Sequence, residues 1–410
     1  MRQQDVARLS NIIGCLAFLF AGPFMAQSTS AQSVEDFIDQ LEWRNIGPAN
    51  MGGRIDDFAV VESDPDIVFL AMASAGVWRT TNNGVTWEPV FDDQLVSSIG
   101  DIAVAPSDPS IVWVGSGESN NRQSSSWGNG VYKSTDGGDS WAHVGLEDTL
   151  HIGRIVIHPN DPEVVYVAAT GHLWGPNEAR GVYKTTDGGQ TWVNTLFIDE
   201  DTGIIDVAMD PVSPGTLYAA AYQRRRTAFG FNGGGPGSGI HKTTNGGATW
   251  VRLTNGLPDG ITGRIGLDIY RSDPRIVYAI VQNADGGVFR SEDRGKSWTR
   301  MSETNPRPMY YSQIRVDPSN DQRIWAAGAR MFYSQDGGKT FVSDWVQTIH
   351  GDFHALWINP VDSDHMIAGS DGGVHYSYDR GRTWDFVNTM ALGQFYEIGY
   401  DMETPYNVYG

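Results

Sequence analysis

The sequence of 410 residues contains a single cysteine, Cys15, and only 29 lysines and arginines against 49 aspartates and glutamates. One cysteine excludes a framework of intramolecular disulfides. The formal net charge of −20 excludes nucleic acid as a partner, because phosphate backbones repel so acidic a chain. Long apolar runs are also missing, since the longest, residues 12–26, is shorter than the ~20 residues that a membrane-spanning helix needs. We therefore expect neither a disulfide nor a membrane span.

That apolar run has the features of a secretory signal. Two arginines precede it, and a small-residue cleavage site ends at Ala31. We predict a signal peptide over residues 1–31, a linker over residues 32–40 and one domain over residues 41–410, in a secreted or periplasmic protein. Cleavage removes two basic residues and one acidic residue, so the formal net charge moves from −20 to −21. This acidity favours solubility outside the cell over a specific cation-binding role.

Glycine and tryptophan are abundant, with 49 and 14 residues, and many of them belong to an eight-residue box that occurs seven times. Its third position is Asp or Asn, whose side-chain oxygen can bond backbone N–H groups two residues on, and its fifth is Gly, which tolerates φ > 0. This chemistry is typical of a tight β-turn between two strands, and the last residue supplies an aromatic ring to the core. The boxes are Thr80–Trp87, Ser134–Trp141, Thr185–Trp192, Thr243–Trp250, Ser291–Trp298, Ser334–Phe341 and Ser377–Trp384.

A second repeat runs in phase with the boxes. Each unit begins with an apolar strand that ends near an Asp-Pro or related turn, and a second strand follows, as in residues 155–159 and 164–168. With the runs before and after each box, every unit has four strands, which we name A to D. Units repeated at periods of 43 to 58 residues predict an all-β fold, a β-propeller of four-stranded antiparallel blades with seven complete repeats and the start of an eighth.

Both ends of the chain carry leftover pieces of a unit. Residues around Trp43 resemble a D strand, and residues 394–400 and 407–410 resemble the A and B strands of an eighth unit. We therefore expect a ring that this chain does not fully close, and a missing C-terminal region of the same protein as one of its partners.

Three long B–C loops mark the candidate site. In a four-stranded blade the B–C and D–A connections emerge on one face, so the irregular loops 116–129, 170–180 and 223–238 crowd one sector of that face. Their aromatic rings can stack on sugars or peptide side chains, and their polar groups can orient a ligand. The alternative is that the loops only pack on each other. The predicted ligand-binding residues on these loops are Glu118, Asn121, Arg122, Trp127, His172, Trp174, Glu178, Arg224, Arg225, Arg226, Phe229 and Phe231.

The A strands place charged residues where they enter the central channel. Arginine and aspartate alternate there, with Arg154 among them, which favours pairing around the channel mouth over capture of a ligand carboxylate. The run His350-Gly351-Asp352-Phe353-His354 offers three possible metal ligands at alternate positions, but a hydrogen-bond cluster lining the channel is the favoured interpretation. We include Arg154 and His354 among the candidate ligand-binding residues, and predict no metal, no cofactor and no catalytic residue.

The boxes match the Asp-box, or bacterial neuraminidase, repeat. With the phased Asp-Pro turns they resemble the sortilin-type propeller domain, and most of all a group of secreted bacterial sortilin-like proteins. The resemblance covers residues 41–410 and is carried by Trp43–Pro48, Gly171–Glu178, Tyr222–Gly239 and His354–Pro360. It implies the propeller fold, with ligand binding at or near the channel, in a bacterial protein.

Two enzyme families with similar boxes can be compared residue by residue. Sialidases need an Arg triad with one Arg-Ile-Pro sequence, but the three Arg-Ile pairs of this chain are followed by Asp, Val and Gly, which argues against a sialidase. Xyloglucanase-like propellers carry an Asp just before Gly-Gly-x-Tyr-Arg, where this chain has Ala73, and take a second carboxylate from another propeller. The nearest substitutes here are Asp56, Asp57 and Glu118, each of them better explained as structural.

Three functional hypotheses follow. The leading one is a secreted, non-enzymatic propeller that binds a peptide or a carbohydrate through its B–C-loop face. The alternative is a glycoside hydrolase of the xyloglucanase-like type that needs a C-terminal partner domain. The third is an assembly or scaffold factor without a small ligand.

Overall fold

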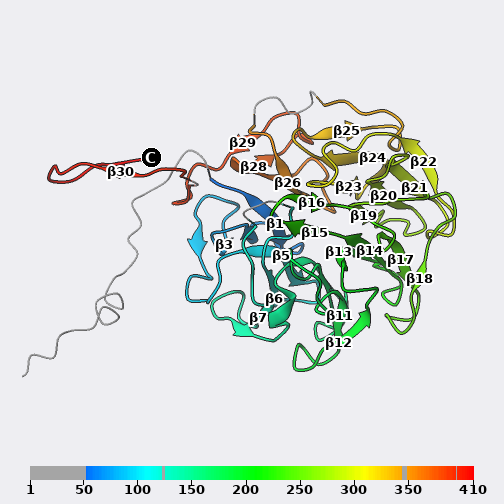
Figure 1. Cartoon of the computed structure of the whole chain (residues 1–410). Coiled ribbons are helices and arrows are strands. Elements are labelled where there is room, and N and C mark those ends of the chain that lie inside the picture. The colour runs from blue at the N-terminus through cyan, green and yellow to red at the C-terminus, as the bar shows by residue number, and fades with distance from the viewer. Residues whose placement is uncertain (1–51, 122–124, 344–348, 394) are drawn as a thin grey trace, which may run out of the picture. The chain divides into compact units, whose positions relative to one another are not determined.

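The computed structural model describes residues 52–121, 125–343, 349–393 and 395–410 (Figure 1). Apart from one short 3-10 helix, Glu147–Thr149, the regular elements of this part are all strands. None of its helices is long and apolar enough to cross a membrane. The predicted signal peptide, the linker and the D-like segment around Trp43 lie outside the described residues.

Seven antiparallel sheets form the blades of a propeller, as predicted. Six have four strands, and in the sixth blade the outer strand is reduced to a bridge between Tyr333 and Val342. The blades are β1–β4 (Ile55–Val60, Val68–Met72, Val77–Thr80, Glu88–Pro89), β5–β8 (Ile99–Ala105, Asp108–Ser116, Val131–Ser134, Ala142–His143), β9–β12 (Ile152–Ile157, Val165–Ala169, Gly181–Thr185, Val193–Leu196), β13, β14, β17 and β18 (Thr202–Met209, Leu217–Gln223, Gly239–Thr243, Val251–Arg252), β19–β22 (Ile265–Ile269, Val277–Val281, Gly287–Ser291, Thr299–Ser302), β23–β25 (Gln313–Asp317, Asn320–Ala327, Phe332–Ser334) and β26–β29 (Phe353–Ile358, Met366–Ser370, Gly373–Ser377, Asp385–Phe386).

The ring closes within the seventh blade. The innermost strand of each blade contacts the innermost strand of the next blade around the ring, and β26 of the last blade contacts β1 of the first. One hydrophobic core lies between each pair of neighbouring sheets, and the core that joins the last blade to the first contains Ile55 and Leu70 from one and Ala355 and Ile367 from the other. The expectation of an unclosed ring is therefore wrong, because the seventh blade supplies its own outer strand, β29.

The C-terminal segment forms a separate hairpin, β30 (Gly399–Tyr400) with β31 (Val408–Tyr409). These strands fall within the two segments predicted to begin an eighth unit. Their residues are exposed and they pair only with each other, so they add no strand to the seven blades.

The boxes form tight turns through a denser set of bonds than predicted. In the third box, Asp187 Oδ1 accepts from the backbone N–H of Thr191 at 2.9 Å and Oδ2 accepts from its hydroxyl at 2.6 Å. The Asp thus bonds a residue four positions on, not two. These hydrogen bonds lower the pKa of Asp187 to about 2. Gly188 and Gly189 both have positive φ, 68° and 93°, so the turn uses two left-handed positions.

Four of the seven box turns also hold the preceding blade. Lys184 on β11 lies 5.2 Å from the ring centre of Tyr166 and donates to the carbonyl of Gly246, in the next box, at 2.9 Å. A carbonyl in the left-handed fourth position of the box points back to the neighbouring blade and is available for this bond. The same contact recurs from Arg79 to Gly137, from Lys133 to Gly188 and from Lys242 to Arg294.

Aspartates join the inner strands. These strands are not paired by a β-ladder, so the carboxylate of one accepts from the backbone N–H of the next. Asp101 bonds Ile155 N at 2.6 Å, and Asp206 bonds Leu267 N at 2.8 Å. Gly100 allows the close approach, because a Cβ at this position would lie 2.1 Å from a backbone carbonyl of β9.

Candidate functional site

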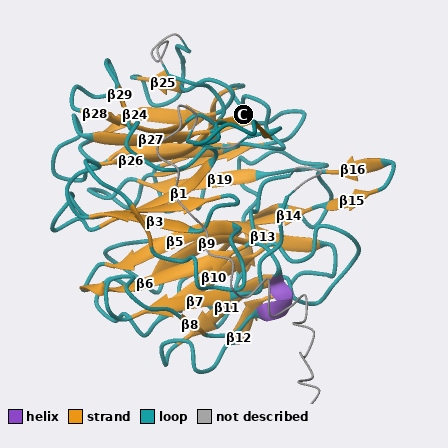
Figure 2. Ribbon diagram, turned by 90° about the vertical axis from the view of Figure 1, so that its left-hand side faces the viewer, coloured by secondary structure: helices purple, strands orange, loops and turns teal. Residues whose placement is uncertain are grey.

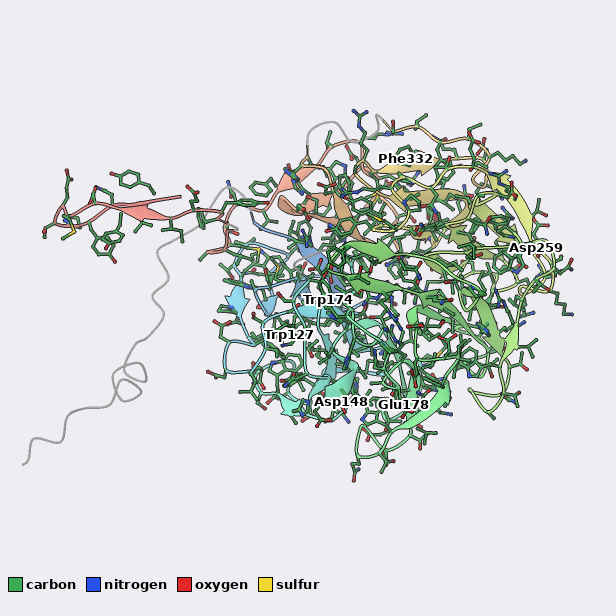
Figure 3. The ribbon with its side chains drawn as sticks, viewed as in Figure 1. Trp127, Asp148, Trp174, Glu178, Asp259 and Phe332 are labelled. Atoms are coloured by element: carbon green, nitrogen blue, oxygen red, sulfur yellow. The ribbon has the colours of Figure 1, made fainter. Side chains whose placement is uncertain are left out.

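A groove lies on the face that carries the B–C loops. Its volume is about 520 Å³, and the rings of Trp127 and Trp174 stand in it with exposed fractions of 70% and 54% (Figure 3). Exposed aromatic rings in a concave site are unusual, because burying such a ring is favourable and a chain normally does so. We call this site the Trp groove, and its described lining is Ser125, Ser126, Trp127, Leu150, His151, His172, Leu173 and Trp174.

Buried polar bonds fix the loop that carries Trp174. Arg180, at the start of β11, is fully buried and donates to the carbonyls of Thr170 at 2.5 Å and His172 at 2.7 Å. Burial lowers the pKa of Arg180 to about 10. His172 in turn contacts the backbone carbonyl of Asp148 through Nε2 at 2.9 Å. The loop is therefore held from its base, and Trp174 projects from a fixed support.

The floor of the groove contacts the backbone of Glu118. His151 Nδ1 contacts the backbone carbonyl of Glu118 at 2.8 Å, and burial lowers the pKa of His151 to about 3, so its ring is neutral. Ser98 joins the same layer, since its hydroxyl donates to Ser126 O and accepts from Glu118 N. Glu118 therefore lies one layer below the groove, and its carboxylate is not part of the groove surface.

Arg54 ties Glu118 into a buried network at the channel entrance. Its guanidinium donates to Glu118 at 2.7 Å and to Asp371 at 2.8 Å, and His354 Nε2 lies 2.9 Å from the same Asp371 oxygen. Burial alone would raise the pKa of Asp371, but the hydrogen bonds from His354 and Arg54 lower it. Burial raises the pKa of Glu118, against the opposing effect of Arg54. His354 is thus a hydrogen-bonding residue of the channel.

Arg154 closes the middle of the channel. Its guanidinium lies 2.8 Å from Asp57, 2.9 Å from Asp101 and 3.2 Å from Asp206. The cavity beside it leaves only about 20 Å³, room for about one water molecule. Arg154 is therefore paired with carboxylates of its own chain, and the channel at this level is too narrow for a peptide or a glycan.

Two predicted residues are buried between the loops. Arg224 is 1% exposed and donates to Ser119 O at 2.6 Å, to Asn121 Oδ1 at 2.7 Å and to the hydroxyl of Thr170 at 2.7 Å. Asn121 donates to Tyr222 and to Met309 O. Both residues link loops to one another, which is the alternative left open by the sequence.

The fourth-blade loop forms a small hairpin, β15 (Arg225–Thr227) with β16 (Gly230–Asn232), which projects beyond the blades (Figure 2). Arg225 is ion-paired with Asp201, and Arg226 lies over the ring of Phe231 at 4.7 Å. Phe229 at the tip is fully exposed. None of these side chains lines the Trp groove. Glu178 is exposed and lies apart from the two tryptophans in Figure 3, and Arg122 is outside the described residues.

The candidate metal ligands are not brought together. β26 begins only at Phe353, and Asp352 before it has a φ of 60°. The strand alternation on which the interpretation rested is therefore broken, so that His350 is exposed while His354 is buried. Among the described residues no group of three His, Cys, Asp or Glu side chains could hold a metal ion.

Several residues of the site have no signal in the sequence. His151 and Leu150 come from a D–A connection, whereas the sequence directs attention to the long B–C loops. Asp371, the partner of Arg54, is 317 positions away from it. Ala73, at the position of the acid in xyloglucanase-like propellers, is buried and donates its backbone N–H to Arg54 O at 3.2 Å.

Comparison with known proteins finds xyloglucanases among the relatives of this chain. No protein-family model matches the chain. A xyloglucanase from Paenibacillus sp. is 24% identical over 370 residues, which cover 80% of this chain and 34% of that protein. Xyloglucanase Xgh74A from Acetivibrio thermocellus is 22% identical over 379 residues, covering 80% and 42%. The solved GH74 xyloglucanase from Xanthomonas campestris superposes with a TM-score of 0.63 at 17% identity, over 85% of this chain and 56% of that one.

These comparisons contradict the leading functional hypothesis. The relatives are named xyloglucanases, so a non-enzymatic binding module is the wrong interpretation, and the glycoside hydrolase alternative is favoured. The sortilin-type resemblance is not confirmed. The chain spans about a third to two fifths of the length of these curated relatives. It is a seven-bladed β-propeller similar to the propellers of GH74 xyloglucanases.

Proposed function

We propose that this chain is the glucan-binding propeller of a secreted glycoside hydrolase that cleaves a β-glucan of the xyloglucan type. The observation that carries the proposal is the Trp groove, where two exposed indole rings stand beside serine and histidine side chains. Flat apolar faces stack on the C–H faces of sugar rings. The volume of the groove, about 520 Å³, has room for more than one sugar unit. The xyloglucanase relatives support the same substrate class.

Hydrolysis of a glycosidic bond needs two carboxyl groups across the bond. The described lining of the groove contains no Asp or Glu, so the acid and the base come from outside this lining. Three acidic residues are connected to the lining of the groove through backbone contacts or a shared loop. Asp148 has a backbone carbonyl bonded to His172, Glu178 is on the loop of His172 and Trp174, and Glu118 lies below His151.

These three residues differ in how exposed their carboxylates are. Glu118 has the raised pKa that suits a general acid, but it is 3% exposed and bonded to Arg54, so it reaches a substrate only after that ion pair opens. Asp148 and Glu178 are exposed and need no rearrangement. We propose that a glucan bound in the Trp groove extends past its edge to this exposed pair, and that any further carboxylate comes from the region that the longer relatives contain.

The experiment is a reducing-end assay on xyloglucan with the 410-residue chain and with the full-length gene product. The variants are Asp148→Asn, Glu178→Gln and Glu118→Gln, with Phe197→Ala as an exposed aromatic control outside the groove. Loss of activity in one of the first two, at unchanged xyloglucan binding, supports the proposal. Binding of xyloglucan without hydrolysis by either form of the protein contradicts it.

A further inference from the structure

A second cavity opens at the other end of the channel, on the face of the A–B turns. It measures about 380 Å³ and lies between the C-terminal ends of the inner strands, and we call it the A–B mouth. Arg154 and Asp206 line both this cavity and the narrow one above it. Their ion pair separates the two, so the mouth is a blind pocket with no residue in common with the Trp groove.

The walls of the mouth are mostly apolar. Val207, Met209, Leu267 and Ile269 come from β13 and β19, with prolines at the rim. A cavity of several hundred Å³ with apolar walls and a few charged groups is typical of a small-molecule site. The apolar part of a ligand would therefore lie against these strands.

The rim already binds a carboxylate. Arg271, in the turn after β19, holds Glu62 with two hydrogen bonds of 2.6 and 2.9 Å. Glu62 follows β1 in the first blade, so the pair joins two turns on the A–B face that are 209 positions apart in sequence. Both side chains are nearly half exposed, 46% and 45%, so water competes for both charged groups. Arg271 therefore gives up its partner at low cost.

A second guanidinium in the mouth has spare donors. Arg315 on β23 is part-buried and donates one hydrogen bond, from Nη1 to the carbonyl of its neighbour Ile314 at 2.8 Å. Among the described residues no carboxylate lies within ion-pair distance of it, and its charge interacts at longer range with that of Asp268. Its Nε and Nη2 groups donate no hydrogen bond within this part of the chain. The nearby carboxylate of Asp268 already accepts from two backbone N–H groups, of Val316 at 2.7 Å and Ile269 at 2.9 Å.

We propose that the A–B mouth binds a small carboxylic acid with an apolar body. The carboxylate accepts two hydrogen bonds from Arg315, since a guanidinium fork matches a carboxylate. The apolar body lies against Met209 and Leu267, and Arg271 adds a second cation at the rim when it releases Glu62. This site is on the opposite face from the Trp groove and does not depend on the proposed hydrolase activity.

The test is isothermal titration calorimetry of the 410-residue chain with octanoate, and with 1-octanol as the uncharged probe. We expect octanoate to bind and 1-octanol to bind at least tenfold more weakly. Arg315→Gln should weaken octanoate binding tenfold or more, Arg315→Lys less than that, and Glu62→Gln should strengthen it several-fold because it frees Arg271. Arg275→Gln is the control, because Arg275 is exposed and paired with Asp273 in its own turn.

Three results would overturn the proposal. They are the absence of octanoate binding at millimolar concentration, equal binding of the alcohol, and unchanged binding in a folded Arg315→Gln variant whose circular dichroism equals that of the wild type. N-acetyl-leucine, titrated in parallel, distinguishes the source of the ligand, because it resembles a peptide C-terminus whereas octanoate is a free acid. Hydrolysis of xyloglucan should be the same in all these variants.

Discussion

Replacing Arg154 with Met tests how the centre of the propeller is held together. The wild-type guanidinium lies 2.8, 2.9 and 3.2 Å from three carboxylates, of Asp57, Asp101 and Asp206. Met is similar in length and has no charge, so the variant leaves these carboxylates together without a cation. Removing one member of a buried ion pair costs about 3–5 kcal/mol. We expect the free energy of unfolding at pH 7 to fall by about that amount.

The pH dependence of the loss identifies its cause. Without Arg154, the cation that opposes the burial-raised pKa of Asp101 is gone. The unfavourable effect of this charged carboxylate is therefore present at neutral pH and decreases as the carboxylate is protonated. In the wild type, burial already raises the pKa of Asp101. The difference between Arg154→Met and wild type should therefore shrink as the pH falls from 7 towards 4.

The assay is urea unfolding followed by tryptophan fluorescence at pH 7 and pH 4.5. Arg271→Met is the control, because its ion pair with Glu62 is nearly half exposed and should cost at most about 1 kcal/mol. A loss below about 1 kcal/mol for Arg154→Met, or a loss that is the same at both pH values, would show that Arg154 does not stabilise the fold by compensating these carboxylates.

Two further predictions concern stability. Lys184→Met removes the hydrogen bond to Gly246 and the contact over Tyr166, and should lower the free energy of unfolding by about 1–2 kcal/mol, whereas the exposed Lys339→Met should leave it unchanged in the same urea titration. The folded pKa of His151, about 3, is below its unfolded value of about 6.5, so the unfolded chain takes up this proton first and stability falls as the pH drops from 6.5 towards 3. At pH 5 this one ring should cost about 2 kcal/mol, and a His151→Gln variant should lose that much less between pH 7 and pH 5; an identical pH profile would contradict this.

The fold was predictable because its determinants are local. The Asp or Asn, the left-handed glycine and the closing aromatic of each box lie within eight residues, and the sequence shows all of them. Closure of the ring was not predictable in the same way. Residues 394–410 do contain two strands, but whether they join a blade depends on which edge is already occupied, and β29 occupies it in the seventh blade.

The site was predictable only in part, for the same physical reason. Trp127 and Trp174 stood out because they interrupt the repeat on the loop-bearing face, and both line the groove. Arg224 and Asn121 are on loops of the same face, and the sequence does not distinguish them from ligand-binding residues. Their hydrogen-bond partners are far along the chain, so both residues link loops to one another. His350 and His354 differ in exposure because the left-handed Asp352 precedes the strand.

The role of the Trp groove in hydrolysis is measured by the rate at which the full-length gene product releases reducing ends from xyloglucan, compared with its Trp127→Ala/Trp174→Ala double variant. Each stacked ring contributes about 1 kcal/mol, so we expect release by the wild type and a loss of kcat/KM of roughly thirtyfold in the double variant, with a normal fold. Absence of release by the wild type, or an unchanged kcat/KM in the double variant, would contradict it.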